Sequence, residues 1–107
     1  MYSPSPLFFG PRGFISDGDM TPPKVIIYTT PYCFSCLTAK ALLDRKGVTY
    51  AEIDVGRNPE ERRRMAVRAN GRRSVPQIFI DEIHIGGGDE LHDLNRQGFL
   101  DRLLVRP

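Results

Sequence analysis

The chain has 107 residues, which is typical of a single domain with one modest hydrophobic core. Its hydrophobic fraction of 40% and charged fraction of 26% are those of a globular protein rather than a disordered one. The formal net charge of +2 is too small to indicate nucleic-acid binding. No apolar run approaches the roughly 20 residues that a membrane helix needs. We therefore expect neither a nucleic-acid partner nor a membrane partner.

The first 23 residues differ in composition from the rest of the chain. They are rich in proline and glycine, and no basic segment precedes their short apolar patch, so they do not resemble a signal peptide. We expect a disordered N-terminal extension over residues 1–23 and one folded domain over residues 24–107.

Regular elements are predicted from Lys24 onward. Residues 24–29 (KVIIYT) form a short β-branched run that predicts a buried strand. Residues 34–46 predict a helix with Cys36, Ala39, Leu42 and Leu43 on one face, ended by Gly47. Residues 48–55 alternate in polarity and predict a second strand.

The second half of the chain continues with a helix, a hairpin and further helices. Asn58 is the expected N-cap of a helix that starts at Pro59 and ends at Ala69. Residues 76–81 and 83–86 predict two strands joined at Asp81-Glu82, a poor turn dipeptide. Asp89 is the expected N-cap of the next helix, which Gly98 ends, and a short helix with Leu100, Leu103 and Leu104 follows.

The order of elements is therefore β-α-β-α-β-β-α, followed by the short terminal helix. The first two strands are joined through a helix, so they should be parallel with a right-handed crossover. The hairpin adds antiparallel strands. We expect an α/β protein with a four-stranded mixed sheet flanked by helices.

The chain has two cysteines, Cys33 and Cys36, in a C-x-x-C pair at the junction of the first strand and helix. A sulfur at a helix N-terminus lies near unpaired backbone N–H groups and the positive end of the helix dipole, which stabilise a thiolate. The thiolate is the attacking species in disulfide exchange. Cys33 is the expected nucleophile, and Cys36, one turn further on, the expected resolving thiol.

Two other interpretations of the cysteines remain open at this point. A zinc site would need two further ligands, and the histidines, His84 and His92, are both expected to face solvent. We therefore expect no metal site. The second alternative is a pair of inert core cysteines, which the position at a strand–helix junction makes less attractive.

Four segments together resemble glutaredoxins of the thioredoxin superfamily, most closely the small bacterial dithiol members. They are "IIYTTPYCFSC", "ALLDRKGV", "RRSVPQIFID" and "HIGGGDEL", and they occur in the family's order and spacing between Lys24 and about Leu104. The resemblance implies a thioredoxin-like fold. It also implies a glutathione-dependent thiol–disulfide oxidoreductase that reduces protein–glutathione mixed disulfides and protein disulfides.

The resemblance also implies a glutathione site. Pro76 would be the family's cis-proline, and Val75 before it would offer its backbone to the cysteinyl part of glutathione. Gly88 and Asp89 would hold the γ-glutamyl end. Arg68 would lie near the glycine carboxylate, with Arg72 and Arg73 as competitors. The complete set of expected glutathione-binding residues is Thr30, Phe34, Ser35, Arg68, Val75, Pro76, Gly87, Gly88, Asp89 and Glu90.

The sequence departs from the family pattern at the active site. The family's usual Pro-Tyr between the cysteines is Phe34-Ser35 here, and the family's preceding lysine is Thr30. Dithiol members with a small residue in place of that proline can hold a [2Fe–2S] cluster between two subunits. Phe34 is not small, so a cluster is the less favoured cofactor and glutathione the favoured one.

Two alternative functions follow from these departures. The first is a cluster-binding carrier, and the second is a disulfide donor recycled by thioredoxin reductase. The expected partners are glutathione and glutathionylated or disulfide-containing proteins. We expect a cytoplasmic protein, because two cysteines in a redox pair do not make an extracellular disulfide framework. We also expect a monomer.

Overall fold

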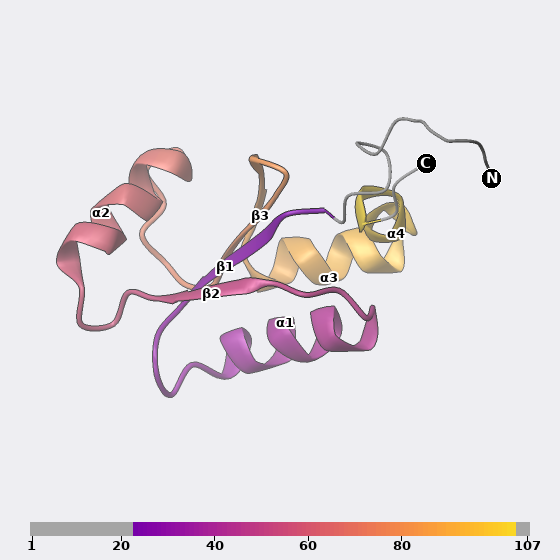
Figure 1. Ribbon diagram of the computed structural model, residues 1–107, viewed down its shortest axis with the longest axis horizontal. Coiled ribbons are helices and arrows are strands. Elements are labelled where there is room, and N and C mark those ends of the chain that lie inside the picture. Colours follow the sequence, from indigo (N-terminus) through magenta and orange to yellow (C-terminus); the bar gives the residue numbers. More distant parts are fainter. Residues whose placement is uncertain (1–22, 105–107) are drawn as a thin grey trace, which may run out of the picture.

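The structure is a computed structural model that describes residues 23–104. The expected N-terminal extension over residues 1–23 lies, apart from Pro23, outside the described residues, as do residues 105–107. Eight elements follow one another along the chain (Figure 1): β1 (Val25–Thr29), α1 (Phe34–Arg45), β2 (Ala51–Asp54), α2 (Pro59–Arg68), β3 (Gln77–Ile80), β4 (Ile83–Gly86), α3 (Gly88–Arg96) and α4 (Phe99–Leu104).

The strands form one mixed sheet in the order β2-β1-β3-β4. β1 pairs with β2 in parallel and with β3 in antiparallel orientation, and β3 and β4 form the hairpin. The predicted α/β class, the four-stranded mixed sheet and the order of elements are therefore confirmed. The observed β2 is shorter than the predicted strand over residues 48–55, because its pairing with β1 covers Ala51 to Asp54.

The two faces of the sheet pack against different helices. Val25 and Ile27 of β1 face α1, α3 and α4, in a core cluster with Leu42 and Leu91. Tyr28 and Phe79 lie on the opposite face, in a smaller cluster with Met65 and Ala69 at α2. Figure 1 shows α1 and α2 on opposite sides of the strands. The alternation of side chains along β1 therefore places Thr29 and the start of α1 on the same side of the sheet.

The predicted N-cap of α3 was wrong by two residues. Gly87, not Asp89, is the N-cap, so Asp89 lies within the first turn. The reason is a different capping contact, because the carboxylate of Glu90 accepts a hydrogen bond of 2.6 Å from the Gly87 N–H. The side chain of the third helical residue thus accepts the hydrogen bond of the Gly87 N–H, which has no acceptor within the helix.

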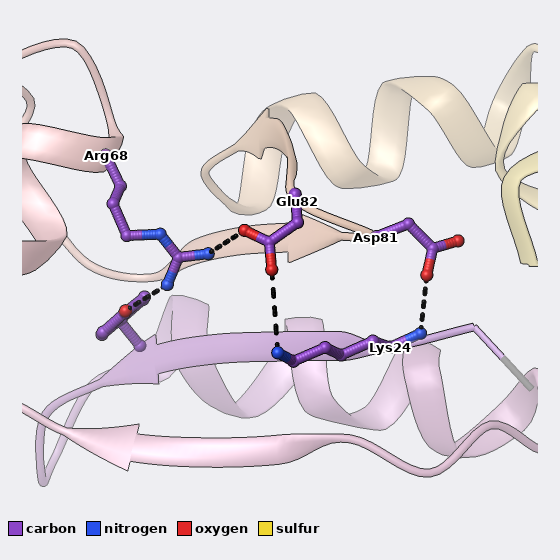
Figure 2. A network of polar contacts seen from close by, with 5 residues as sticks. Lys24, Arg68, Asp81 and Glu82 are labelled. Atoms are coloured by element: carbon purple, nitrogen blue, oxygen red, sulfur yellow. Dashed lines mark hydrogen bonds and ion pairs between the residues drawn. The ribbon is translucent and has the colours of Figure 1, made fainter.

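The hairpin between β3 and β4 turns at Asp81 and Glu82, as predicted from an unfavourable dipeptide. Both residues have positive φ, 50° and 71°, which the two-residue hairpin turn requires. Figure 2 shows the contacts that hold them. The Asp81 carboxylate accepts a 2.9 Å hydrogen bond from the Lys24 N–H, and Glu82 pairs with Lys24 Nζ at 3.7 Å. These contacts offset the backbone cost that Gly or Asn would avoid.

The expectation that His84 faces solvent was wrong. Its ring lies 5.0 Å from the Phe79 ring, and its Nε2 is 2.6 Å from Oε1 of the buried Gln77. The physical reason is that His84 is opposite Phe79 in the β3–β4 register, on the sheet face that α2 covers. Burial lowers the pKa of His84 from its usual value.

Candidate active site

The two cysteines lie at the start of α1 in different environments. Cys33 is the N-cap residue and is partly exposed, whereas Cys36 is buried, with 2% of its surface accessible. Cys33 Sγ accepts a hydrogen bond from the Cys36 N–H at 3.2 Å. This geometry stabilises negative charge on Cys33 and leaves its sulfur accessible for attack on a disulfide.

Cys36 is a poor nucleophile in the reduced resting state. Burial, with a smaller contribution from its hydrogen bond with Cys33, raises the pKa of the Cys36 thiol to about 12. The thiol therefore stays protonated until Cys33 has reacted. This difference fits the expected division of roles between nucleophile and resolving thiol.

A polar groove of about 160 Å³ begins at the first turn of α1 and continues to the start of α3. We call it the proline groove. It is lined by Ser35, Arg72, Ser74, Val75, Pro76, Gly87, Gly88, Asp89 and Glu90. The Val75–Pro76 peptide bond is cis. Seven of the ten residues expected to bind glutathione are thus brought together in one groove, namely Ser35, Val75, Pro76, Gly87, Gly88, Asp89 and Glu90.

Two glycines in the proline groove keep it free of side chains at the start of α3. A Cβ on Gly87 would lie 3.3 Å from the Pro76 carbonyl oxygen and 3.4 Å from Arg72 Nη2. At Gly88 a Cβ would contact Ser35 and Pro76 at 3.6–3.7 Å, so this glycine mainly keeps the space open. The groove therefore leaves the N-terminal N–H groups of α3 within reach of an anion.

Glu90 has a structural role in this groove. Its carboxylate accepts the Gly87 N–H and lies 3.5 Å from Arg72 Nη1. The hydrogen bond from Gly87 lowers the pKa of Glu90, with Arg72 adding to the effect. Glu90 thus holds the start of α3 and keeps the Arg72 guanidinium at the groove.

The structure does not bring Arg68 to the proline groove. Its guanidinium lies 4.3 Å from the Phe79 ring centroid and donates to the Tyr28 hydroxyl at 2.7 Å. Figure 2 shows the same group reaching Glu82 at the hairpin, 3.5 Å away. The nearby competitor that the sequence also offered, Arg72, lines the groove instead.

Thr30 and Phe34 also lie outside the proline groove. Phe34 is 78% exposed, and the neighbouring Tyr32 and Leu37 are also exposed. Thr30 belongs to a second groove, of about 270 Å³, which we call the cysteine groove. It is lined by Thr29, Thr30, Pro31, Tyr32, Cys33, Cys36, Leu37, Lys40, Glu52 and Asp54. Both cysteines therefore line a groove distinct from the proline groove.

The cysteine groove contains charged residues that the sequence analysis missed. Lys40 Nζ lies 3.0 Å from Glu52 Oε2, and the Thr29 hydroxyl donates to the same oxygen at 2.7 Å. The spacing of Lys40, four residues after Cys36 on α1, is a signal that the sequence did offer. Glu52 had no such signal, because its position depends on the register of β2 against β1.

Comparison with known proteins agrees with this site. The family model described as Glutaredoxin matches residues 25–85. The chain is 52% identical over 82 residues to "Glutaredoxin" from Pseudomonas aeruginosa. The alignment covers 77% of this chain and 96% of that protein. Within residues 23–104, no helix is long and apolar enough to cross a membrane.

Solved structures show the same fold. A glutaredoxin from Brucella melitensis is 52% identical, with a TM-score of 0.67, and the match covers 76% of this chain and 87% of that one. A buckwheat glutaredoxin–glutathione complex is 28% identical, with a TM-score of 0.70 and coverage of 77% and 76%. The predicted resemblance is thereby confirmed: the chain belongs to the glutaredoxin family of thiol–disulfide oxidoreductases with a thioredoxin-like fold.

Proposed function

We propose that the chain uses glutathione to reduce protein–glutathione mixed disulfides, with Cys33 as nucleophile and the proline groove as the glutathione site. The observation that carries the proposal is a groove that combines backbone donors and a cation and reaches Ser35, two residues after the accessible Cys33 in the first turn of α1. The buckwheat relative, whose structure is a complex with glutathione, supports the choice of ligand.

Each part of glutathione has a chemical counterpart in the groove. The backbone of Val75 pairs with the cysteinyl residue as a short strand would. The N–H groups at the start of α3 receive the γ-glutamyl carboxylate, and the Asp89 carboxylate pairs with the α-ammonium group. The Arg72 guanidinium attracts the glycyl carboxylate, a role that the sequence analysis assigned to Arg68.

The reaction consists of two exchanges. The Cys33 thiolate attacks the glutathione sulfur of the mixed disulfide, forms a Cys33–glutathione disulfide and releases the substrate as a thiolate, which takes a proton from water. The thiolate of a second glutathione attacks the sulfur of the glutathione bound to Cys33. The products are glutathione disulfide and the Cys33 thiolate, so each turnover consumes one free glutathione and transfers the disulfide bond from the substrate to glutathione.

Protein disulfides require the second cysteine. Attack by Cys33 gives a mixed disulfide with the protein, and Cys36 displaces the protein by forming a Cys33–Cys36 disulfide. Glutathione then reduces this disulfide. Thr30 and Ser35, which stand where the family has Lys and Tyr, favour a second candidate, a donor that thioredoxin reductase recycles. We place either reaction in the cytoplasm, where thiols are kept reduced, and in a monomer.

The test is the reduction of a glutathionylated peptide by free glutathione, followed with the Cys36→Ser and Cys33→Ser variants. We expect Cys36→Ser to retain turnover and Cys33→Ser to lose it, because the two exchanges use only Cys33. If Cys36→Ser is inactive while the native protein still reduces protein disulfides, the proline groove is not a glutathione site and the thioredoxin-like donor is the better assignment.

A further inference from the structure

The cysteine groove, on the β2 side of α1, includes the reactive Cys33 but none of the residues that line the proline groove. It contains the buried Cys36 together with Lys40 and Glu52. Of the described residues that line this groove, Lys40 is the one that carries a positive charge. The groove therefore contains both the Cys36 thiol, which can ionise, and the positively charged Lys40.

Local geometry explains why Lys40 lies there. It follows Cys36 by four residues in α1, so the two side chains are on the same helix face. Glu52 pairs with Ile27 in the register of β1 and β2, and Ile27 faces α1. The carboxylate of Glu52 therefore reaches Lys40 across the groove, with a 3.0 Å ion pair.

The ion pair is anchored to the sheet. The Thr29 hydroxyl, on a side chain that is 2% exposed, donates to the Glu52 oxygen that also contacts Lys40. The Lys40 side chain is 23% exposed, so its amino group has little freedom to leave. Asp54, on the same strand, and Tyr50, packed near Lys40, are the other titratable groups on this side.

Cys36 must become a thiolate to act as the resolving sulfur. Once Cys33 is in a mixed disulfide, it no longer carries a charge or a thiol proton, so two of the influences that raise the pKa of Cys36 disappear. Burial remains and opposes ionisation, whereas the backbone hydrogen bond at Thr30 and, to a smaller extent, the charge of Lys40 favour it. Of these two favourable influences, the charge of Lys40 is the one that a side-chain substitution can remove.

We propose that Lys40, held in place by Glu52 and Thr29, is a positioning residue for the resolving step, in which it stabilises the thiolate of Cys36 as it attacks. This inference rests on the proposed role of Cys36 in reducing protein disulfides. In the step, the Cys36 thiol gives its proton to water in the groove. The thiolate attacks Cys33 Sγ, the Cys33–Cys36 bond forms, and the bond from Cys33 to the substrate sulfur breaks with the electron pair leaving on the substrate.

The competing explanation is that the ion pair only ties α1 to β2. A structural role would affect folding and every reaction of the active site alike. A role for the charge would affect the Cys36 step alone, most strongly at a pH at which Cys36 is largely protonated. In that case an arginine at position 40 would preserve the rate.

The experiment is stopped-flow reaction of the reduced protein with excess 5,5′-dithiobis(2-nitrobenzoate), which needs no glutathione. The first release of thionitrobenzoate reports attack by Cys33, and the second, independent of reagent concentration, reports attack by Cys36 on the mixed disulfide. Cys36→Ser identifies the second phase by its loss. Because glutathione is absent, failure of the glutathione site leaves this measurement intact.

We expect Lys40→Met to slow the second phase relative to the first by about fivefold near neutral pH, the size expected for one nearby charge. The pH profile of the second phase should move to higher pH, and Lys40→Arg should restore a rate within about twofold of the native one. The matched control is Lys46→Met, which removes a lysine of equal exposure, 23%, paired with Asp101 at the other end of α1.

Three outcomes would overturn the proposal. The first is a second phase in Lys40→Met that stays within about twofold of native, and the second is an equal slowing by Lys46→Met. The third is a slowing in Lys40→Met that is the same at every pH, which would assign the pair a structural role. Circular dichroism of each variant establishes that the compared proteins are folded.

Discussion

Arg68 and Arg72 offer a sharp test of the site, because the two arginines are four residues apart and face different surroundings. Arg68 packs on Phe79 and bonds to Tyr28, whereas Arg72 lines the proline groove. We expect Arg68→Met to lower the free energy of unfolding and to leave the KM for glutathione unchanged. Arg72→Met should raise the KM for glutathione and leave the free energy of unfolding nearly unchanged.

The magnitudes follow from the contacts. The Arg68 side chain is 32% exposed, so its hydrogen bond to Tyr28 and its stacking on Phe79 are partly screened. We estimate their loss at about 1–2 kcal/mol, or roughly 5–15 °C in Tm for a domain of this size. The Arg72 side chain is 43% exposed, so its pair with the glycyl carboxylate of glutathione would be screened by solvent. Loss of that pair should cost about 1 kcal/mol, which is about fivefold in KM.

The assays are thermal unfolding followed by circular dichroism and steady-state reduction of a glutathionylated peptide at varied glutathione. Each variant is the control for the other, since both remove one guanidinium. A rise in KM for Arg68→Met equal to that for Arg72→Met would refute the reasoning. So would an unchanged KM in both, because the proline groove would then not bind the glycyl carboxylate through Arg72.

Two further predictions concern stability. Gly86→Ala should cost about 1–3 kcal/mol, because φ is +119° and the new Cβ would lie 2.9 Å from Glu90 Oε1. Gly98→Ala, with φ of +82° and open space, should cost less in the same urea titration, and equal losses would contradict the role of crowding. Glu52→Gln should lower stability at neutral pH by about 1 kcal/mol. The Thr29 hydrogen bond, helped by Lys40, lowers the folded-state pKa of Glu52 from 4.5, so this contribution is complete above that value and is lost as pH falls through the folded-state pKa. Urea titrations of both proteins should therefore converge in acid, and a difference that stays constant with pH would argue against it.

Much of the fold followed from local patterns in the sequence. The β-branched run of β1, the Asn58-Pro59 start of α2 and the glycine after α1 have local physical causes, and the helix between β1 and β2 dictates their parallel pairing. The cysteines and the residues around Pro76 and Gly88 lie in short motifs. Such motifs report a site well when its parts are contiguous in sequence.

Apart from the N-cap of α3, the structure differs from the sequence-based expectations where a side chain is placed by distant residues. Arg68 is held by Tyr28, 40 residues away, through a contact that exists only once α2 packs on the sheet. His84 is half-buried because Phe79 lies opposite it across the hairpin. The Lys40–Glu52 pair likewise needs the register of β2 against β1. None of these contacts has a signature in the periodicity of one element.

The sheet order has a consequence for self-association. β2 and β4 are the outer strands, and each has four residues. β2 carries the exposed carboxylates of Glu52 and Asp54, and β4 has a register irregularity next to Ile78 and Phe79 of β3. Short, charged or irregular edges are poor templates for strand addition by another chain. A concentrated solution of this protein thus meets a built-in barrier to edge-to-edge aggregation, while the apolar strands β1 and β3 stay shielded between the two edges.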